Sequence, residues 1–240
     1  MKFLFFWHFN FNFQLSTNLT VLSLLHAGSA LEFVPQHGWT KASIDKAIEQ
    51  HGLDPSTTNG MFKQEGLDLL MFFIEEANNS LIEYLATQAK ENKPTTEEAR
   101  AAFIEDAMKR RLQLIIPYIE TWPQALTLMA SPQAAREIFD NGANLMDEIW
   151  YHAGDMDTDF TWYAKRAALA AISASAELYM LNDKSPEFRD TWDFLHRRLN
   201  DARVMGGVKD SLNNAAGDTI SLVSSGITTA QNMLRGKGPF

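Results

Sequence analysis

The stretch LEFVPQHGWTKASIDKAIEQHGLDPSTTNGMF, residues 31–62, decides the fold class that this sequence predicts. Ile44 and Ile48 recur at helical spacing in it, on a short helix that Thr40 can cap and Gly52 can end. A tight turn and a second short segment follow before the chain enters a long apolar-periodic stretch. Two short helices around a tight turn are typical of a helix-turn-helix, so the first question is whether the protein reads DNA.

The rest of the sequence is also helical by pattern. Apolar residues recur with a helical period over about 65–90, 95–116, 131–154, 157–181 and 185–205, and no segment alternates in the manner of a strand. The expected helix starts are a capping box formed by Thr95 and Glu98, a Ser131 cap before Pro132, and a Ser185 cap. The sequence therefore predicts an all-α protein.

Charge argues against nucleic acid as the partner. The chain has a formal net charge of −9. GWT, SIDKAIEQHGL and NGMF resemble the DNA-binding head of TetR-type regulators, but the segment that would read bases, DPSTTNGMF, contains no Lys or Arg. Acidic side chains outnumber the positive ones in the head, which are Lys41, Lys46 and Lys63 against Asp45, Glu49, Asp54 and Glu65. We therefore expect a TetR-like helix-turn-helix that serves as a packing unit and does not bind DNA.

The sequence offers no constellation for catalysis. Cysteine is absent, which excludes thiolate metal sites and cysteine nucleophiles. No Glu-x-x-His pair of the di-iron bundles occurs, and Asp193 with His196 is a single analogue on what is expected to be a solvated helix face. GxSxG, P-loop and GxGxxG motifs are also missing. We predict no catalytic residue, no metal and no cofactor, and hence a protein that is not an enzyme.

The block TDFTWYAKR, residues 158–166, places aromatic and charged side chains within two helical turns. Asp159, Arg166 and one of the two aromatic residues share a face by their spacing. Adjacent helical residues point about 100° apart, so Trp162 and Tyr163 cannot both be buried and one is expected near the surface. An aromatic side chain with Arg at a surface is typical of a protein–protein hot spot. The alternative is that both rings complete the edge of the core.

Three blocks are similar, in order and spacing, to the ubiquinone biosynthesis accessory protein of the Coq-nine family: LIIPYIETWPQAL (114–126), DEIWYHAGDMDTDFTWYAKRAALAAI (147–172) and SPEFRDTWDFLHRRLND (185–201). The resemblance covers about residues 31–206. It implies a TetR-like fold that is not used for transcription, a homodimer, and a place on the matrix face of the mitochondrial inner membrane. It also implies binding of isoprenoid quinone intermediates and other lipids, and association with the di-iron hydroxylase of demethoxyubiquinone.

The resemblance also implies which residues meet that hydroxylase. In the family the surface that corresponds to the aromatic block engages the enzyme. We carry this role onto the block itself and onto the end of the preceding helix, which would lie beside it in an antiparallel hairpin. The predicted partner-binding residues are Asp147, Ile149, Tyr151, His152, Asp159, Trp162, Tyr163 and Arg166.

The sequence gives weaker evidence for the lipid site. An isoprenoid tail needs an apolar cavity between helices, and the candidates are apolar or aromatic residues at helical spacing in two segments. They are Leu112, Ile116, Tyr118, Trp122, Leu126, Leu169, Ile172 and Met180. Stripes of this kind also form ordinary core, so this alternative stays open.

The carboxyl-terminal segment has its own pattern. After Gly206 and Gly207 the apolar residues follow a helical period opposite Ser, Thr and Asn, and they include Leu212, Ile220, Val223, Ile227 and Leu234. A helix that is apolar on one side can lie in a membrane interface, and with few charges it would bind through apolar insertion. The alternative is that it docks on its own body or on the dimer mate.

The expected organisation has four parts: a poorly ordered leader at 1–28, the head at 29–64, a lipid-binding and dimerisation body at 65–206, and the amphipathic membrane helix at 207–240. The leader MKFLFFWHFNFNFQL is strongly aromatic and has no Arg, unlike a mitochondrial presequence. The resulting hypothesis is a lipid-presenting accessory protein. The rivals are a TetR-type regulator that senses a hydrophobic ligand and a helical scaffold without a ligand.

Overall fold

The computed structural model describes residues 27–58, 62–155 and 160–206, and within these ranges it contains helices and no strand. The prediction of an all-α fold is thereby confirmed. The elements in chain order are η1 (Leu31–Phe33), α2 (Val34–His37), α3 (Lys41–Gln50), η2 (Pro55–Thr58), α4 (Gly66–Glu91), α5 (Glu97–Gln113), η3 (Ile116–Thr121), α6 (Trp122–Met129), α7 (Ala135–His152), α8 (Phe160–Met180), η4 (Pro186–Phe188) and α9 (Arg189–Gly206).

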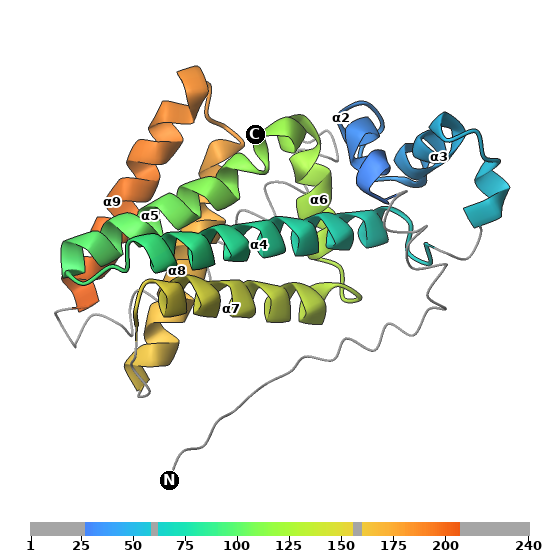
Figure 1. The fold of residues 1–240 in the computed structure, drawn as a ribbon. Helices are drawn as coiled ribbons and strands as arrows, with labels where there is room; N and C mark the ends of the chain where they lie inside the picture. The colour runs from blue at the N-terminus through green and yellow to red at the C-terminus, as the bar shows by residue number, and fades with distance from the viewer. Residues whose placement is uncertain (1–26, 59–61, 156–159, 207–240) are drawn as a thin grey trace, which may run out of the picture.

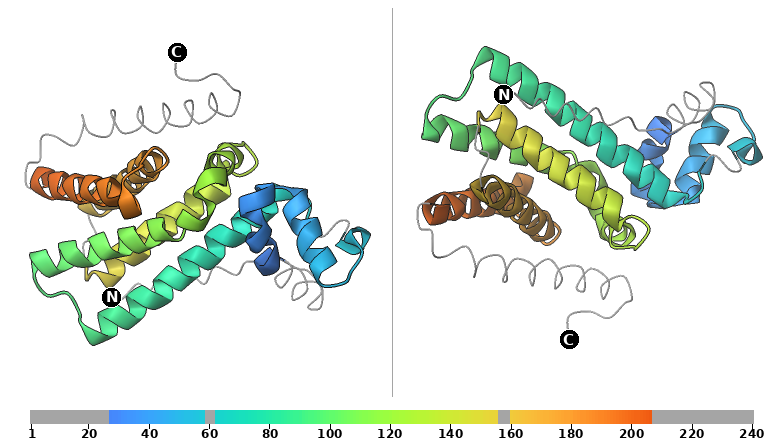
Figure 2. Two further views of the ribbon diagram at one scale, coloured as in Figure 1. Left: turned by 90° about the horizontal axis from the view of Figure 1, so that it is seen from above. Right: turned by 90° about the horizontal axis from the view of Figure 1, so that it is seen from below.

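The long helices form a bundle and the short ones form a head at one end of it (Figure 1). Helix α4 runs the length of the body with α5 and α7 beside it, and α2 and α3 lie at its amino-terminal end. Helices α8 and α9 pack on each other, with α7 against α8 and α5 against α9 (Figure 2). Short head helices followed by a bundle of longer ones are consistent with the TetR-like arrangement.

The head is joined to the body by a cluster of aromatic rings. Trp39 follows α2, Phe73 belongs to α4, Tyr118 to η3, and Trp122 begins α6. Their ring centroids lie 5.0–5.8 Å apart in tilted or edge-to-face pairs. Such pairs contribute about 0.5–1.5 kcal/mol each beyond the apolar area that they bury. Because Trp39 and Trp122 are both fully buried, the head and the body share one core.

Polar and steric contacts reinforce the same joint. The Gln124 side chain accepts a hydrogen bond from the Trp39 backbone N–H at 2.8 Å and donates one to the Trp39 carbonyl at 3.2 Å. A Cβ atom on Gly66, the first residue of α4, would lie 2.0 Å from that carbonyl oxygen, so only glycine fits there. Gly38 has φ = 70°, which favours glycine as well. The chain therefore enters the body by one defined path.

Two features of the head weaken its likeness to a DNA reader. Lys41 pairs with Asp45 and Lys46 with Glu49, so these lysines already have acidic partners. The segment in the position of a recognition helix, η2, is a single 3-10 turn of four residues. Two of the three lysines of the head are thus paired with acidic side chains, which reduces the positive charge available for phosphate contacts.

Two predicted helix caps are wrong, and a third is right in position but makes no side-chain capping bond. The cap of α5 is Thr96 instead of Thr95, and its side chain accepts from the Ala99 N–H at 3.2 Å. Helix α7 begins at Ala135, because Ser131 opens a turn in which its carbonyl accepts backbone bonds and its side chain caps nothing. Thr40 does precede α3, but its hydroxyl donates to a carbonyl of α2 and leaves the helix uncapped.

The expected start of the last helix is also corrected. The segment after Ser185 forms η4, in which Glu187 and Phe188 have positive φ values of 56° and 57°, and α9 begins only at Arg189. Asp183 holds this connection, since its carboxylate accepts from the Ser185 N–H at 2.7 Å and from both the N–H and the hydroxyl of Thr191 at 2.8 and 2.5 Å. The hydrogen bonds of Asp183 stabilise a turn in which two residues that are not glycine have positive φ.

Candidate functional site

The end of α7 is fixed by a glycine turn. Gly154 has φ = 85°, its N–H donates to the Tyr151 carbonyl, and the Asp155 N–H donates to the Trp150 carbonyl at 2.9 Å. This pair of bonds is a Schellman motif, which ends the helix. It turns the chain so that Asp155 lies between α7 and α8. The Asp155 side chain is only 2% exposed.

Four charged side chains form a network beneath this turn. The two carboxylate oxygens of Asp155 pair with different cations of α8, one with Lys165 Nζ at 2.6 Å and the other with an Arg166 Nη1 at 3.2 Å. The Arg166 Nε donates to Asp147 of α7 at 2.6 Å. The Arg166 side chain, which is 9% exposed, is therefore buried with two carboxylate partners in place.

Aromatic rings stand on this network. The Arg166 guanidinium lies 3.9 Å from the centroid of the Trp162 ring, and Trp162 packs edge-to-face on Tyr163 at 4.7 Å. On α7, Tyr151 packs edge-to-face on His152 at 5.2 Å. Tyr163 and Tyr151 are 68% and 63% exposed, which is unusual for rings of this size. We call Tyr151, Trp162 and Tyr163, together with the Arg166 guanidinium under Trp162, the aromatic surface.

The predicted partner residues fall into distinct positions. The expectation that one ring of the Trp–Tyr pair would lie near the surface is confirmed, since Tyr163 is exposed whereas Trp162 is partly buried. Asp147 is half exposed, and His152 is mostly covered and lies 3.4 Å from Glu148. Ile149 is fully buried in the core, from where it can support the surface only through packing. Asp159 lies outside the described residues.

The sequence reasoning missed three residues of this site. Asp155 was not singled out, nor were Lys165 and Trp150, although Lys165 Nζ lies 5.3 Å from the Trp150 ring and the Trp150 indole donates to the Lys165 carbonyl at 3.3 Å. The available signal was the Gly-Asp pair at a helix end, followed ten residues later by Lys-Arg. A carboxylate set just past a helix end can reach a cation on the next helix of a hairpin.

The predicted lipid residues lie in the interior between α5, η3, α6 and α8. Four of them, Leu112, Trp122, Leu169 and Met180, are fully buried. The other four, Ile116, Tyr118, Leu126 and Ile172, are partly buried and pack against the same core. Ile116 also lines the groove described below.

Two ionisable side chains are set among these apolar residues. The Trp122 indole donates to the Glu177 carboxylate at 2.7 Å. Burial raises the pKa of Glu177, and the hydrogen bond and the nearby charge of Arg111 offset this only in part. Burial likewise lowers the pKa of Arg111, while the charge of Glu177 raises it. The Arg111 Nη1 atom is buried without a hydrogen-bond partner. The interior is therefore polar at one point.

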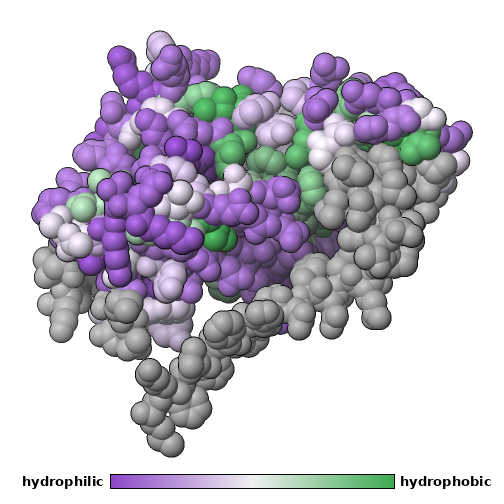
Figure 3. Space-filling view, in the orientation of Figure 1, coloured by the Kyte–Doolittle hydropathy of each residue, from purple (hydrophilic) through white to green (hydrophobic). Residues whose placement is uncertain are grey.

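The described surface is hollowed beside the connection between α8 and α9. An open groove of about 620 Å³ lies between α5 and η4, and its lining includes Ile116, Phe188, Lys109 and Trp192. The Lys109 Nζ lies 5.2 Å from the Trp192 ring centroid. Hydrophilic residues cover most of the described face in Figure 3, with smaller apolar patches among them.

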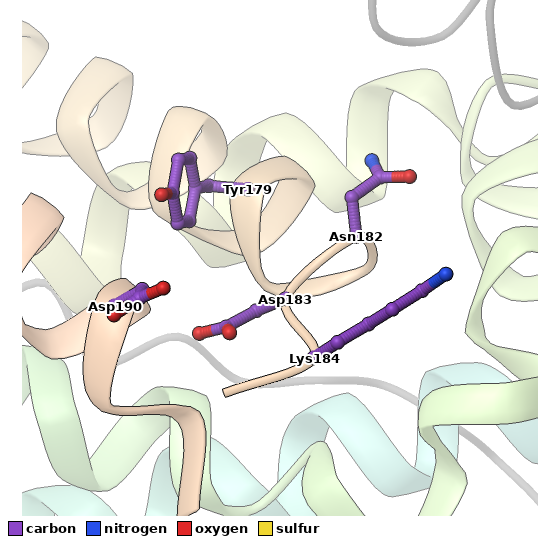
Figure 4. Close-up of a pocket in the computed structure, with 5 residues that line it drawn as sticks. All are labelled: Tyr179, Asn182, Asp183, Lys184 and Asp190. Atoms are coloured by element: carbon purple, nitrogen blue, oxygen red, sulfur yellow. The ribbon is translucent and has the colours of Figure 1, made fainter. Parts of the chain in front are cut away.

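A smaller pocket of about 300 Å³ opens on the same connection (Figure 4). Its lining is polar apart from one ring and comprises Tyr179, Asn182, Asp183, Lys184 and Asp190. The Asp183 carboxylate points into this space but is already occupied by the hydrogen bonds that hold the turn. The pocket is therefore explained as part of the connection.

The described residues bear on the expectation about metals, whereas the predicted membrane-binding residues lie outside them. Among the residues that the structure describes, no group of three or more His, Asp or Glu side chains could hold a metal ion. No helix within the same ranges is long and apolar enough to cross a bilayer. The predicted membrane-binding residues, Leu212, Ile220, Val223, Ile227 and Leu234, lie outside the described residues.

Known proteins resemble this chain over most of its length. The COQ9 family model matches residues 135–206, the stretch that contains the aromatic surface. The human mitochondrial ubiquinone biosynthesis protein COQ9 is 37% identical over 207 residues, which are 85% of this chain and 65% of the human protein. The COQ9-B protein of Xenopus laevis is 37% identical over 213 residues, 85% of this chain and 70% of the relative. The Drosophila melanogaster protein is 39% identical over 174 residues, 72% of this chain and 53% of its own length.

The chain thus spans about two thirds of the length of the human and frog relatives. The identity of 37% extends over aligned stretches of 207 and 213 residues, which are 85% of this chain. From the shared sequence and the helical structure together, the conclusion is that this chain belongs to the COQ9 family.

Proposed function

We propose that this protein is an accessory protein of ubiquinone biosynthesis in the mitochondrion, without catalytic activity of its own. In this proposal it binds isoprenoid quinone intermediates and presents them to the di-iron hydroxylase of demethoxyubiquinone. Its relatives carry ubiquinone biosynthesis and mitochondrial location in their names. The observation that carries the proposal is the aromatic surface, where exposed Tyr163 packs on Trp162 and Trp162 stacks on the buried Arg166. Exposed Tyr151 lies one turn after Asp147, which pairs with Arg166.

The composition of this surface supports a protein partner. Tyr, Trp and Arg are the residues that dominate binding energy at interfaces. Exposed Tyr163 and Tyr151 together leave large apolar rings in water, and a partner that covers them gains that area. Asp147 and Glu148 stand on α7 beside the rings and are about half exposed. A partner with cationic side chains around an apolar centre would complement them.

The interior supports a ligand with an apolar tail and a polar head. The buried Arg111 Nη1 lacks an acceptor, and it belongs to α5 next to Leu112. A quinone ring offers acceptor oxygens, whereas its isoprenoid tail suits the apolar residues of α5, α6 and α8. The homodimer, the matrix face of the inner membrane and the membrane role of residues 207–240 remain parts of the same proposal.

The partner surface is tested by Tyr163→Ala. We expect the variant to stay folded, because the ring is exposed, and to lose about tenfold or more in affinity for the hydroxylase, since hot-spot truncations cost about 2 kcal/mol or more. Binding is measured by surface plasmon resonance with the purified hydroxylase. Phe139→Ala is the matched control. Phe139 is also an exposed aromatic residue of the α7–α8 hairpin, at 73% exposure, but it lies near the amino-terminal end of α7. Equal losses in both variants would count against a specific surface.

Lipid binding is tested by filling the interior. We expect the full-length protein, extracted and examined by lipid mass spectrometry, to carry isoprenoid quinones. Ile172→Trp should reduce that load severalfold because residue 172 is partly buried among the candidate residues. Ala170→Trp places the same ring at an exposed position of α8 and should leave the load unchanged. A protein that is reproducibly free of lipid, yet binds the hydroxylase, would leave a docking scaffold.

A further inference from the structure

The carboxylate of Asp155 is buried beside Arg166, the residue on which Trp162 of the aromatic surface stacks. Its side chain is 2% exposed, and its position is set by the Schellman turn at Gly154. Burying a carboxylate is costly unless it is paired, so a buried acid at this place needs a reason. The reason lies in what its two oxygens hold.

Each oxygen of Asp155 holds a different cation. Lys165 and Arg166 are adjacent on α8, and adjacent helical residues point about 100° apart. One carboxylate can bridge them only from a position between the two directions, which is where the turn places it, at 2.6 Å from Lys165 Nζ and 3.2 Å from Arg166 Nη1. Asp155 thereby fixes two neighbouring side chains of α8 relative to the end of α7.

Each of those cations in turn supports a tryptophan. The edge of the Arg166 guanidinium is bound to Asp147 and Asp155, which leaves its face free to lie 3.9 Å from the Trp162 ring centroid. Lys165 lies over Trp150, whose indole N–H donates to the Lys165 carbonyl. A guanidinium held on two edges cannot rotate away from the ring that stacks on it.

We propose that Asp155 is a positioning residue of the partner surface: through Arg166 it sets the indole of Trp162 in its binding orientation before a partner arrives. Ordering side chains at an interface weakens binding, and ordering them in the free protein removes that cost. Asp155 itself touches no partner. The inference rests on the proposed function, in which the aromatic surface binds the hydroxylase.

The test compares Asp155→Asn with a variant that destabilises the same helix elsewhere. The full-length protein is labelled with 5-fluorotryptophan, and the Trp162 fluorine resonance is assigned with Trp162→Phe. In Asp155→Asn, we expect that resonance to move toward the position of free fluorotryptophan, and hydroxylase affinity to fall about tenfold, from the cost of reordering Trp162 and Arg166. Met146→Ala removes buried contacts of α7 and leaves the network intact, so both readouts should stay at wild-type values.

A second variant guards against loss of the fold. All spectra are recorded under conditions in which the far-ultraviolet circular dichroism of the variant matches that of the wild type. The second variant, Arg166→Lys, keeps the positive charge but removes the planar guanidinium under Trp162. It should move the same resonance. An unchanged Trp162 resonance in Asp155→Asn, or an equal change in Met146→Ala, would overturn the inference. If the wild type fails to bind the hydroxylase, the proposed function falls, while the fluorine spectra still decide whether Asp155 positions Trp162.

Discussion

Asp183 is the residue on which the connection between α8 and α9 depends most. Partial burial raises the pKa of its carboxyl, but the hydrogen bonds accepted from Thr191 and Ser185 outweigh this and lower the pKa to about 2. The same bonds hold a turn in which Glu187 and Phe188 have positive φ. One short side chain thus offsets the strain of two residues and starts a helix.

Replacing Asp183 should therefore loosen α9. We expect Asp183→Ala to lower the free energy of unfolding by about 2 kcal/mol, because it removes a cap-like acceptor with several hydrogen bonds. Urea denaturation followed by circular dichroism measures the change. Asp193→Ala, at an exposed position of α9, is the control and should have little effect.

Acid should remove the same contribution. The folded pKa of about 2 lies below the ordinary value of 3.8, so the stabilisation is present above about pH 4 and is lost as the pH falls toward 2. The difference in stability between wild type and Asp183→Ala should accordingly shrink over that interval. A difference that stays constant down to pH 2.5 would show that the hydrogen bonds do not favour the ionised form.

At the scale of elements, the head and α6 are joined through Gln124. We expect Gln124→Ala to cost about 1–3 kcal/mol, because both hydrogen bonds to the Trp39 backbone are lost and buried polar groups are left unpaired. Hydrogen exchange should rise first at the amides of α3, since the head loses its polar attachment. Gln113→Ala, which changes an exposed glutamine of α5, should leave exchange in α3 as it is.

Periodicity predicted the long helices well, and it predicted their first residues poorly. The segment expected at about 65–90 is α4, Gly66–Glu91, because its apolar face and its ends agree. Ser131 does not cap α7, and in the turn after α6 its carbonyl accepts the backbone bonds. The Ser185 hydroxyl accepts from the Asp190 N–H at 2.9 Å, but α9 begins only at Arg189 because η4 intervenes, and Asp183 accepts from the Thr191 N–H. Which of several polar residues caps a helix depends on the neighbouring element, which a local pattern does not contain.

In the candidate site, too, local spacing predicted some features, and others depend on packing between helices. The rule that adjacent residues point apart was enough to predict that one ring of the Trp–Tyr pair is exposed. It could not place Ile149 in the core or find Asp155, because burial of those residues depends on how α7 and α8 cross. Likewise, helical spacing selected apolar residues such as Leu112 and Leu169 without deciding whether they line a cavity or fill a core.

At the scale of the whole molecule, the membrane and partner roles should be separable. We expect a chain that ends at Gly206 to lose flotation with neutral phosphatidylcholine vesicles, because the apolar stripe of residues 207–240 is removed. Its affinity for the hydroxylase should be unchanged, since the aromatic surface lies on α7 and α8. Undiminished flotation would assign the segment to docking on its own body or on a second copy.

The buried indole of Trp39 has a consequence for engineering. Its ring belongs to the head by sequence and to the body by packing, with Phe73, Tyr118 and Trp122 around it. The head therefore cannot be moved alone into another protein. If the chain were cut between Trp39 and Gly66, the body would keep a cavity the size of an indole, and the Trp39 ring of the transferred head would be exposed to solvent. Chimaeras with other family members should therefore exchange α6 together with the head.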